Sequence, residues 1–180
     1  MDKAEVVIVL AEDDSGHRHL IEKTLRAIIP NPLVRFGNGK DALDYLRGAE
    51  QASRRHLLLL DLNMPVMNGY QVLRHLKEDP RTALIPVIVL TTTDDPEEIQ
   101  RCYDLGCNAY VVKSADYWQL TETMRRLGLF LTIARIPRED TLRSGLPVSA
   151  PNRDREGADY RPATGPVESR RMNSGSMTIS

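Results

Sequence analysis

Short apolar runs alternate along residues 5–130 with longer stretches in which apolar side chains recur every three or four positions. The short runs are rich in valine, isoleucine and leucine, which is typical of strands buried on both faces, whereas the longer stretches have the period of a helix. We predict strands at residues 5–11, 33–36, 57–60, 87–90 and 109–112. Helices are predicted at residues 16–29, 39–48, 70–78 and 96–106, and from residue 116 onward.

This regular alternation predicts an α/β fold, because successive parallel strands are usually joined by a crossover helix. The expected architecture is a doubly wound parallel sheet of five strands with helices on both faces, formed by residues 1–136. Residues 137–180 hold five of the eleven prolines, four glycines and six serines, and their apolar residues follow no period. We predict that this segment is a disordered tail, because it has too little apolar surface to offset the entropy of ordering.

Composition and charge favour a cytoplasmic protein. The formal net charge of −1 gives no reason to expect nucleic acid as a partner. No apolar run approaches the roughly 18 residues needed to cross a bilayer, and the first residues lack the pattern of a signal peptide. Two cysteines are too few for a disulfide framework and suit a reducing compartment. The four histidines have no metal-ligand spacing and are expected on the surface or on helices.

Polar residues stand where the predicted strands end. Asp13 and Asp14 follow the first strand, Asp61 follows the third, Thr91 the fourth and Lys113 the fifth. The carboxyl ends of parallel strands meet at one edge of the sheet, which is where open α/β sheets bind ligands. We therefore expect these five side chains to lie close together.

Such a set of side chains suits phosphoryl transfer. Crowded carboxylates repel each other, and a hard cation with oxygen ligands such as Mg²⁺ relieves that repulsion. Asp61 is then left as a nucleophile, while Lys113 and Thr91 face the oxygens of the transferring group. Taken singly, the residues also have structural interpretations: Asp13 or Asp14 would cap the first helix, and Tyr110 would be a core residue.

The chain carries acidic residues at 12–14, followed by Asp61, Thr91 and Lys113. In this order of residues it resembles the receiver domain of two-component response regulators. The resemblance covers roughly residues 5–130, with further short matches at residues 63–65, 68–69 and 110. It implies a flavodoxin-like sheet with the strand order 2-1-3-4-5. It also implies that Asp61 accepts the phosphoryl group and that Lys113 pairs with one of its oxygens. In the same scheme Thr91 and Tyr110 are the switch residues, which move when the group is bound.

The metal implied by the resemblance is Mg²⁺. Its ligands would be Asp14 directly, Asp13 through water, Asp61, and the backbone carbonyl of Asn63. The sequence departs from the family after Lys113, where Ser114 stands in place of a proline that usually has a cis peptide bond. The way in which Lys113 is presented is therefore open at this stage.

The resemblance implies a single-domain response regulator that is not an enzyme beyond its own phosphorylation and dephosphorylation. The resemblance also implies a sensor histidine kinase as the partner that supplies the phosphoryl group. No DNA-binding or catalytic output region is recognisable after the receiver, so we expect the output to go through protein contacts or phosphate relay. Residues 103–110 and 127–131 narrow the resemblance to regulators that serve phytochrome-type kinases.

Two other functions remain open. A phosphohydrolase of the haloacid dehalogenase type also uses Asp, Thr, Lys and Mg²⁺. That type places an acid two residues after its nucleophile, on the first strand, whereas this chain has Asn63 there and Asp61 on the third strand. The other alternative is a receiver-like scaffold that works without phosphorylation, which the departure at Ser114 allows.

Residues 117–136 are more apolar than a helix with one buried face requires. One interpretation is a last helix and extension packed on their own domain. The other, which we favour, is a homodimer interface formed by the fourth helix, the fifth strand and the last helix with its extension.

Overall fold

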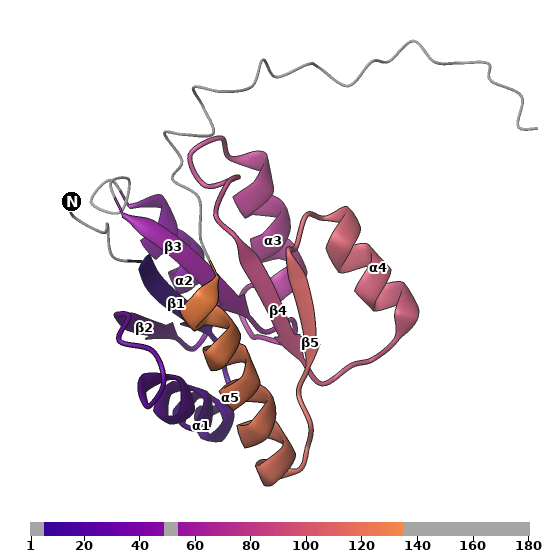
Figure 1. The fold of residues 1–180 in the computed structure, drawn as a ribbon. Coiled ribbons are helices and arrows are strands. Elements are labelled where there is room, and N and C mark those ends of the chain that lie inside the picture. The colour runs from indigo at the N-terminus through magenta and orange to yellow at the C-terminus, as the bar shows by residue number, and fades with distance from the viewer. Residues whose placement is uncertain (1–5, 49–53, 135–180) are drawn as a thin grey trace, which may run out of the picture. The chain divides into compact units, whose positions relative to one another are not determined.

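The computed structural model describes residues 6–48 and 54–134 (Figure 1). The strands in these residues are β1 (Val6–Ala11), β2 (Leu33–Phe36), β3 (Arg55–Leu60), β4 (Val87–Thr91) and β5 (Ala109–Val112). The helices are α1 (Ser15–Arg26), α2 (Gly39–Arg47), α3 (Gly69–Glu78), α4 (Pro96–Asp104) and α5 (Tyr117–Ile133). The tail predicted at residues 137–180 lies outside the described residues, as does the end of the predicted extension.

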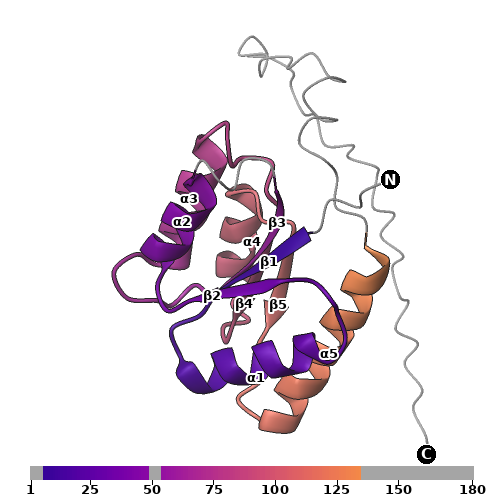
Figure 2. The same cartoon turned by 90° about the vertical axis from the view of Figure 1, so that its left-hand side faces the viewer.

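All neighbouring strands are parallel, and their order is β2-β1-β3-β4-β5. The predicted doubly wound α/β fold and its strand order are therefore confirmed. Figure 2 shows α1 and α5 on one face of the sheet and α2, α3 and α4 on the other. Within the part of the chain that the structure describes, no helix is both long enough and apolar enough to cross a membrane.

Successive side chains of a strand point to opposite sides of the sheet. Because helices cover both sides, the side chains on both faces of the strands are buried. In β3, Leu58 and Leu60 belong to the core beneath α2, α3 and α4. Leu57 and Leu59 belong to the core beneath α1 and α5. This two-sided burial explains why the strands appear in the sequence as continuous apolar runs without a polar face.

The register of the central strands brings two carboxylates together. Ala11 at the end of β1 lies opposite Leu60 at the end of β3. The next residues, Glu12 and Asp61, therefore leave the sheet side by side, and the backbone N–H of Asp61 donates to the carbonyl of Ala11 at 2.9 Å.

The other half of the site is positioned by β4 and β5. Thr91 ends β4 and lies opposite Val112. Lys113 follows Val112, and its backbone N–H donates to the carbonyl of Thr91 at 2.7 Å. The four strand ends thus deliver their polar residues to one edge, as expected for parallel strands.

The loop between β3 and α3 packs tightly against the end of β3. A Cβ atom on Gly69 would lie 2.3 Å from the carbonyl oxygen of Asp61, so this position requires glycine. The backbone N–H of Gly69 also donates to the carbonyl of Leu62 at 2.9 Å. At the tip of the loop, Val66 is exposed and has a φ of 67°, a left-handed conformation that is rare for a β-branched residue.

The structure differs from the sequence predictions at the end of the first helix and at His56. The first helix ends at Arg26 instead of residue 29, and the backbone N–H groups of Ile28 and Ile29 both donate to the carbonyl of Leu25. Pro30 explains the early end, because a proline disfavours helical geometry at the residue before it. The surface position expected for His56 was wrong: this residue is part of β3 and only 3% exposed.

Candidate functional site

A buried lysine lies between two carboxylates at the carboxyl edge of the sheet. Lys113 Nζ is 2.7 Å from Glu12 Oε2 and 3.2 Å from Asp61 Oδ1. The Lys113 side chain is 2% exposed, and both carboxylates are buried as well. Charges removed from water in this way require partners, and the three side chains supply them to one another.

The carboxylates remain short of positive charge despite Lys113. Burial raises the pKa of Asp61, and Lys113 and the backbone N–H groups of Leu62 and Asn63 offset this only in part. Burial also raises the pKa of Glu12, against the opposing effect of Lys113. The site is therefore poised to gain a further cation.

Glu12, Asp13 and Asp61 form a group that could hold that cation. One carboxylate oxygen from each lies within 4.8 Å of the others. Glu12 and Asp61 are buried, whereas Asp13 is exposed at the mouth of the group. Oxygen donors of this kind suit Mg²⁺, so the residues present fit the predicted metal. Asn63, the fourth predicted ligand, is exposed in the loop that follows Asp61.

The structure corrects the acidic pair that we assigned from the sequence. Asp14 does not join the group; its Oδ1 accepts a hydrogen bond from the backbone N–H of His17 at 2.7 Å and caps α1. This hydrogen bond is the main reason why the pKa of Asp14 is lowered. The capping role weighed above for Asp13 or Asp14 therefore holds for Asp14, and Glu12 takes the place given to it in the metal group.

Glu12 could have been found by counting from the strand end. The apolar run stops at Ala11, so Glu12 is the first polar residue at the sheet edge and corresponds in register to Asp61. Arg18 is a second residue that the sequence did not single out. Its Nη1 donates to the carbonyl of Glu12 at 2.7 Å and lies 3.4 Å from that of Asp13, which fixes the acidic loop.

Thr91 lies at the same edge with an unused hydroxyl. The residue is fully buried, and its Oγ1 finds no hydrogen-bond partner among the residues that the structure describes. A buried hydroxyl left in this state costs about 1–3 kcal/mol. An anionic oxygen bound at the site would give the hydroxyl an acceptor.

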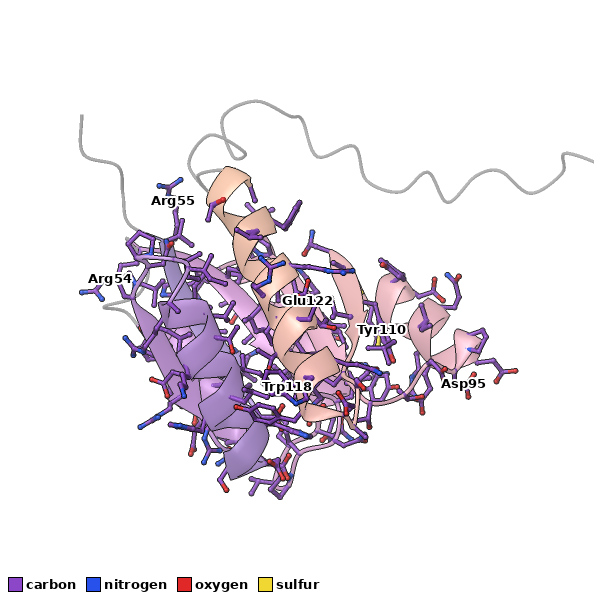
Figure 3. All side chains as sticks on the ribbon, turned by 60° about the horizontal axis from the view of Figure 1, so that its bottom comes forward. Arg54, Arg55, Asp95, Tyr110, Trp118 and Glu122 are labelled. Atoms are coloured by element: carbon purple, nitrogen blue, oxygen red, sulfur yellow. The ribbon has the colours of Figure 1, made fainter. Side chains whose placement is uncertain are left out.

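Tyr110, the other predicted switch residue, lies beside α4 (Figure 3). Its hydroxyl donates to the carbonyl of Thr93 at 3.1 Å. Thr93 belongs to the short loop between β4 and α4, two residues after Thr91. Tyr110 is thus linked to the loop that follows Thr91.

Ser114 does not prevent Lys113 from reaching the site. The peptide bond between Lys113 and Ser114 is trans. The Ser114 hydroxyl donates to Gln119 and accepts from the backbone N–H of Asp116, at the start of α5. In place of a proline, the chain has a residue that helps to fix the first turn of α5.

Comparisons with known proteins agree with this geometry. The response regulator receiver domain family matches residues 8–125. Response regulator Rcp1 of Synechocystis is 32% identical over 128 residues, which is 69% of this chain and 87% of Rcp1. The Mn²⁺-bound form of Rcp1 has a solved structure that matches at a TM-score of 0.66 with 30% identity and covers 73% of this chain and 99% of Rcp1.

Two further solved structures are similar. A receiver domain from Rhodospirillum rubrum has 45% identity and a TM-score of 0.68, covering 73% of this chain and 96% of that one. The phosphorylated cyanobacterial phytochrome response regulator RcpA has 38% identity and a TM-score of 0.68, covering 75% of this chain and all of RcpA.

The chain belongs to the response regulator receiver domain family. Members of this family generally transduce signals and are not enzymes, and they accept a phosphoryl group on an aspartate from a histidine kinase. The chain resembles the response regulators of phytochromes in particular.

The burial of Asp61 leads to a prediction about pH. The pKa of Asp61 is raised in the folded chain, so protonation of Asp61 stabilises the fold. This stabilisation is fully present below the ordinary pKa of an aspartate and is lost as the pH rises through the raised pKa. In metal-free buffer at about pH 7, Asp61→Asn should therefore be more stable to urea than the wild type. The difference should shrink toward about pH 4.

Asp44→Asn serves as the control, because Asp44 is an exposed carboxylate on α2. A gain in stability for Asp61→Asn that is the same at every pH would contradict the explanation.

Proposed function

We propose that this chain is a single-domain response regulator that accepts a phosphoryl group on Asp61 from a sensor histidine kinase. The observation that carries the proposal is the buried Lys113 ammonium, 3.2 Å from Asp61 Oδ1 and already paired with Glu12. In this position the ammonium holds the nucleophile in place and can also face an oxygen of the incoming group.

The proposed reaction is an in-line displacement at phosphorus. An Asp61 carboxylate oxygen forms the new O–P bond, and the N–P bond of the kinase phosphohistidine breaks, with its electron pair returning to the imidazole nitrogen. Lys113 and the Thr91 hydroxyl face the phosphoryl oxygens as charge moves onto them. A bound Mg²⁺ would neutralise negative charge on the carboxylates and the phosphoryl group.

Glu12, Asp13 and Asp61 would hold that Mg²⁺, together with the backbone carbonyl of Asn63 and water. The oxygen donors within 4.8 Å of one another support this assignment, and the Mn²⁺-bound structure of Rcp1 supports a divalent metal in a relative. Asp13 is the exposed member of the group, so it can be changed with little effect on the core.

Neutralising Asp13 should weaken Mg²⁺ binding, whereas neutralising Asp14 should not. For Asp13→Asn we expect an affinity about tenfold or more lower, because losing even an outer-shell partner typically has an effect of that size. Asp14→Asn is the matched control, since asparagine also caps helices well. Calorimetric titration with Mg²⁺ measures both. A larger loss in Asp14→Asn would restore the pairing that we assigned from the sequence.

Incubation with acetyl phosphate and Mg²⁺, followed by intact-mass measurement, separates the candidate functions. We expect a stoichiometric phosphate adduct in the wild type, none in Asp61→Asn, and an unchanged adduct in the surface variant Asp44→Asn. Sustained turnover of a phosphate ester would indicate the phosphohydrolase, and the absence of any adduct would indicate the scaffold.

Phosphorylation would act on the rest of the molecule through Thr91 and Tyr110. If the Thr91 hydroxyl moves to the phosphoryl oxygens, the loop that carries Thr93 moves with it. The hydrogen bond from Tyr110 to the carbonyl of Thr93 is 3.1 Å long and would be lost or remade in that movement. This gives two arrangements of the loop and α4, which phosphorylation can bias.

We propose that the kinase is of the phytochrome class and that the protein works in the cytoplasm. The sequence identity with RcpA and Rcp1 supports a kinase of the phytochrome class, since RcpA is a cyanobacterial phytochrome response regulator. The unpaired cysteines are in keeping with the second, because Cys102 and Cys107 are both free and buried.

A homodimer is the proposed output. Large apolar side chains are exposed on α4, β5 and α5, the surface that Tyr110 and the Thr93 loop adjoin. They are Tyr103, Val112, Tyr117, Trp118, Leu129 and Phe130. Exposed large apolar side chains are typical of an interface, and a second copy of the chain would cover these about a twofold axis.

Sedimentation of the full chain tests the dimer. We expect Mg²⁺ with beryllofluoride, a mimic of the bound phosphoryl group, to shift the wild type toward dimer. Phe130→Ser should oppose the shift, because Phe130 is 56% exposed on α5. Leu84→Ser is the control, since Leu84 is 40% exposed outside this surface, between α3 and β4. A monomer under every condition would rule out the dimer.

A further inference from the structure

Helix α4 is held to the domain by few contacts. Cys102 is its one buried residue, and most of the remaining side chains face solvent. α4 is also the helix that the Thr93 loop leads into. Besides the packing of Cys102 in the core, α4 has a contact with α3.

The residue on α3 is Tyr70, the second residue of this helix. It follows Gly69, whose Cα is packed so closely on the end of β3 that an added Cβ would be 2.3 Å from the carbonyl oxygen of Asp61. The hydrogen bond from the N–H of Gly69 to the carbonyl of Leu62 fixes the same point. The backbone of Tyr70 is therefore tied to the strand end that carries Asp61.

The side chain of Tyr70 reaches α4. The guanidinium carbon of Arg101 lies 4.3 Å from the centroid of the Tyr70 ring, in a cation–π contact. The Tyr70 hydroxyl is enclosed, and burial together with the neighbouring Cys102 and Glu98 raises its pKa to about 12. The hydroxyl lies beside Glu98 and Cys102 of α4, but it makes no hydrogen bond of normal geometry among the described residues. The contact with a defined geometry is therefore the one between the ring and Arg101.

We propose that Tyr70 and Arg101 form a latch that holds α4 in its resting position and opposes the switch set off at Asp61. This inference rests on the proposed function. Tyr70 is fixed to the end of β3, whereas Arg101 belongs to the helix that follows the Thr93 loop. When that loop moves toward the phosphoryl group, α4 must slide relative to Tyr70, and the stack is disturbed.

The latch sets how much phosphorylation is needed to move α4. A cation–π contact at a partly exposed site corresponds to a factor of about two to five in an equilibrium constant. Removing it should shift the switch toward the active arrangement by about that factor, without changing the phosphoryl site. Tyr70 and Arg101 are positioning residues in this scheme, since neither contacts the reacting atoms.

The test is hydrogen–deuterium exchange of the α4 amides in the full chain, with Mg²⁺ present and beryllofluoride increased stepwise. Arg101→Ala should lower the beryllofluoride concentration for the half-maximal change in α4 by about two- to fivefold. Tyr70→Phe keeps the ring and should behave as the wild type, whereas Tyr70→Leu should behave as Arg101→Ala. Arg126→Ala is the control, because Arg126 is an exposed arginine of α5 that pairs with Glu122.

The two substitutions should not add. The double variant Arg101→Ala with Tyr70→Leu should shift the midpoint no further than either change alone, because each removes the same contact. A wild-type midpoint in Arg101→Ala, or additive shifts in the double variant, would overturn the latch while leaving the proposed function in place. Failure of the wild type itself to respond to beryllofluoride would instead overturn the proposed function and the latch with it.

Discussion

The structure depends on one buried cation. Lys113 comes from the edge strand β5 and reaches Glu12 after β1 and Asp61 after β3, so it links three strands across the carboxyl edge of the sheet. Without it, Glu12 and Asp61 would be buried and unpaired, a state that the protein interior does not tolerate. The same pairing favours the charged form of Asp61 and holds it in place, so the contact that stabilises the edge is also the one that would make Asp61 a usable nucleophile.

Much of this arrangement follows from the sequence. A leucine run such as residues 57–60 has no polar face, so it has to be covered on both sides, and the helices between such runs are the only elements available to cover it. Once the strands are parallel, the residues after them must meet. Asp61, Thr91 and Lys113 could be placed for that reason alone, and the order of the strands came from the family resemblance.

Other features depend on details that the pattern does not contain. Three acids in a row, residues 12–14, offer three candidates for the sheet edge and for the helix cap. The end of the apolar run favours Glu12 for the edge, but only the register of β1 with β3 establishes it, and the hydrogen bond from His17 identifies Asp14 as the cap. His56 appears polar in the sequence but is buried in β3, where its ring packs edge-on against Tyr45. For Glu12 and His56 the deciding contacts come from residues distant in the sequence, which the local pattern does not reveal.

Trp118 is the only tryptophan of the chain, and it stands 77% exposed in the first turn of α5, five residues beyond Lys113. An indole that is already surrounded by water in the folded protein changes its surroundings little when the chain unfolds. It changes them a great deal when another surface covers α5. The fluorescence of Trp118 is therefore a poor measure of unfolding, but it would report directly, without a label, on the proposed assembly through α5.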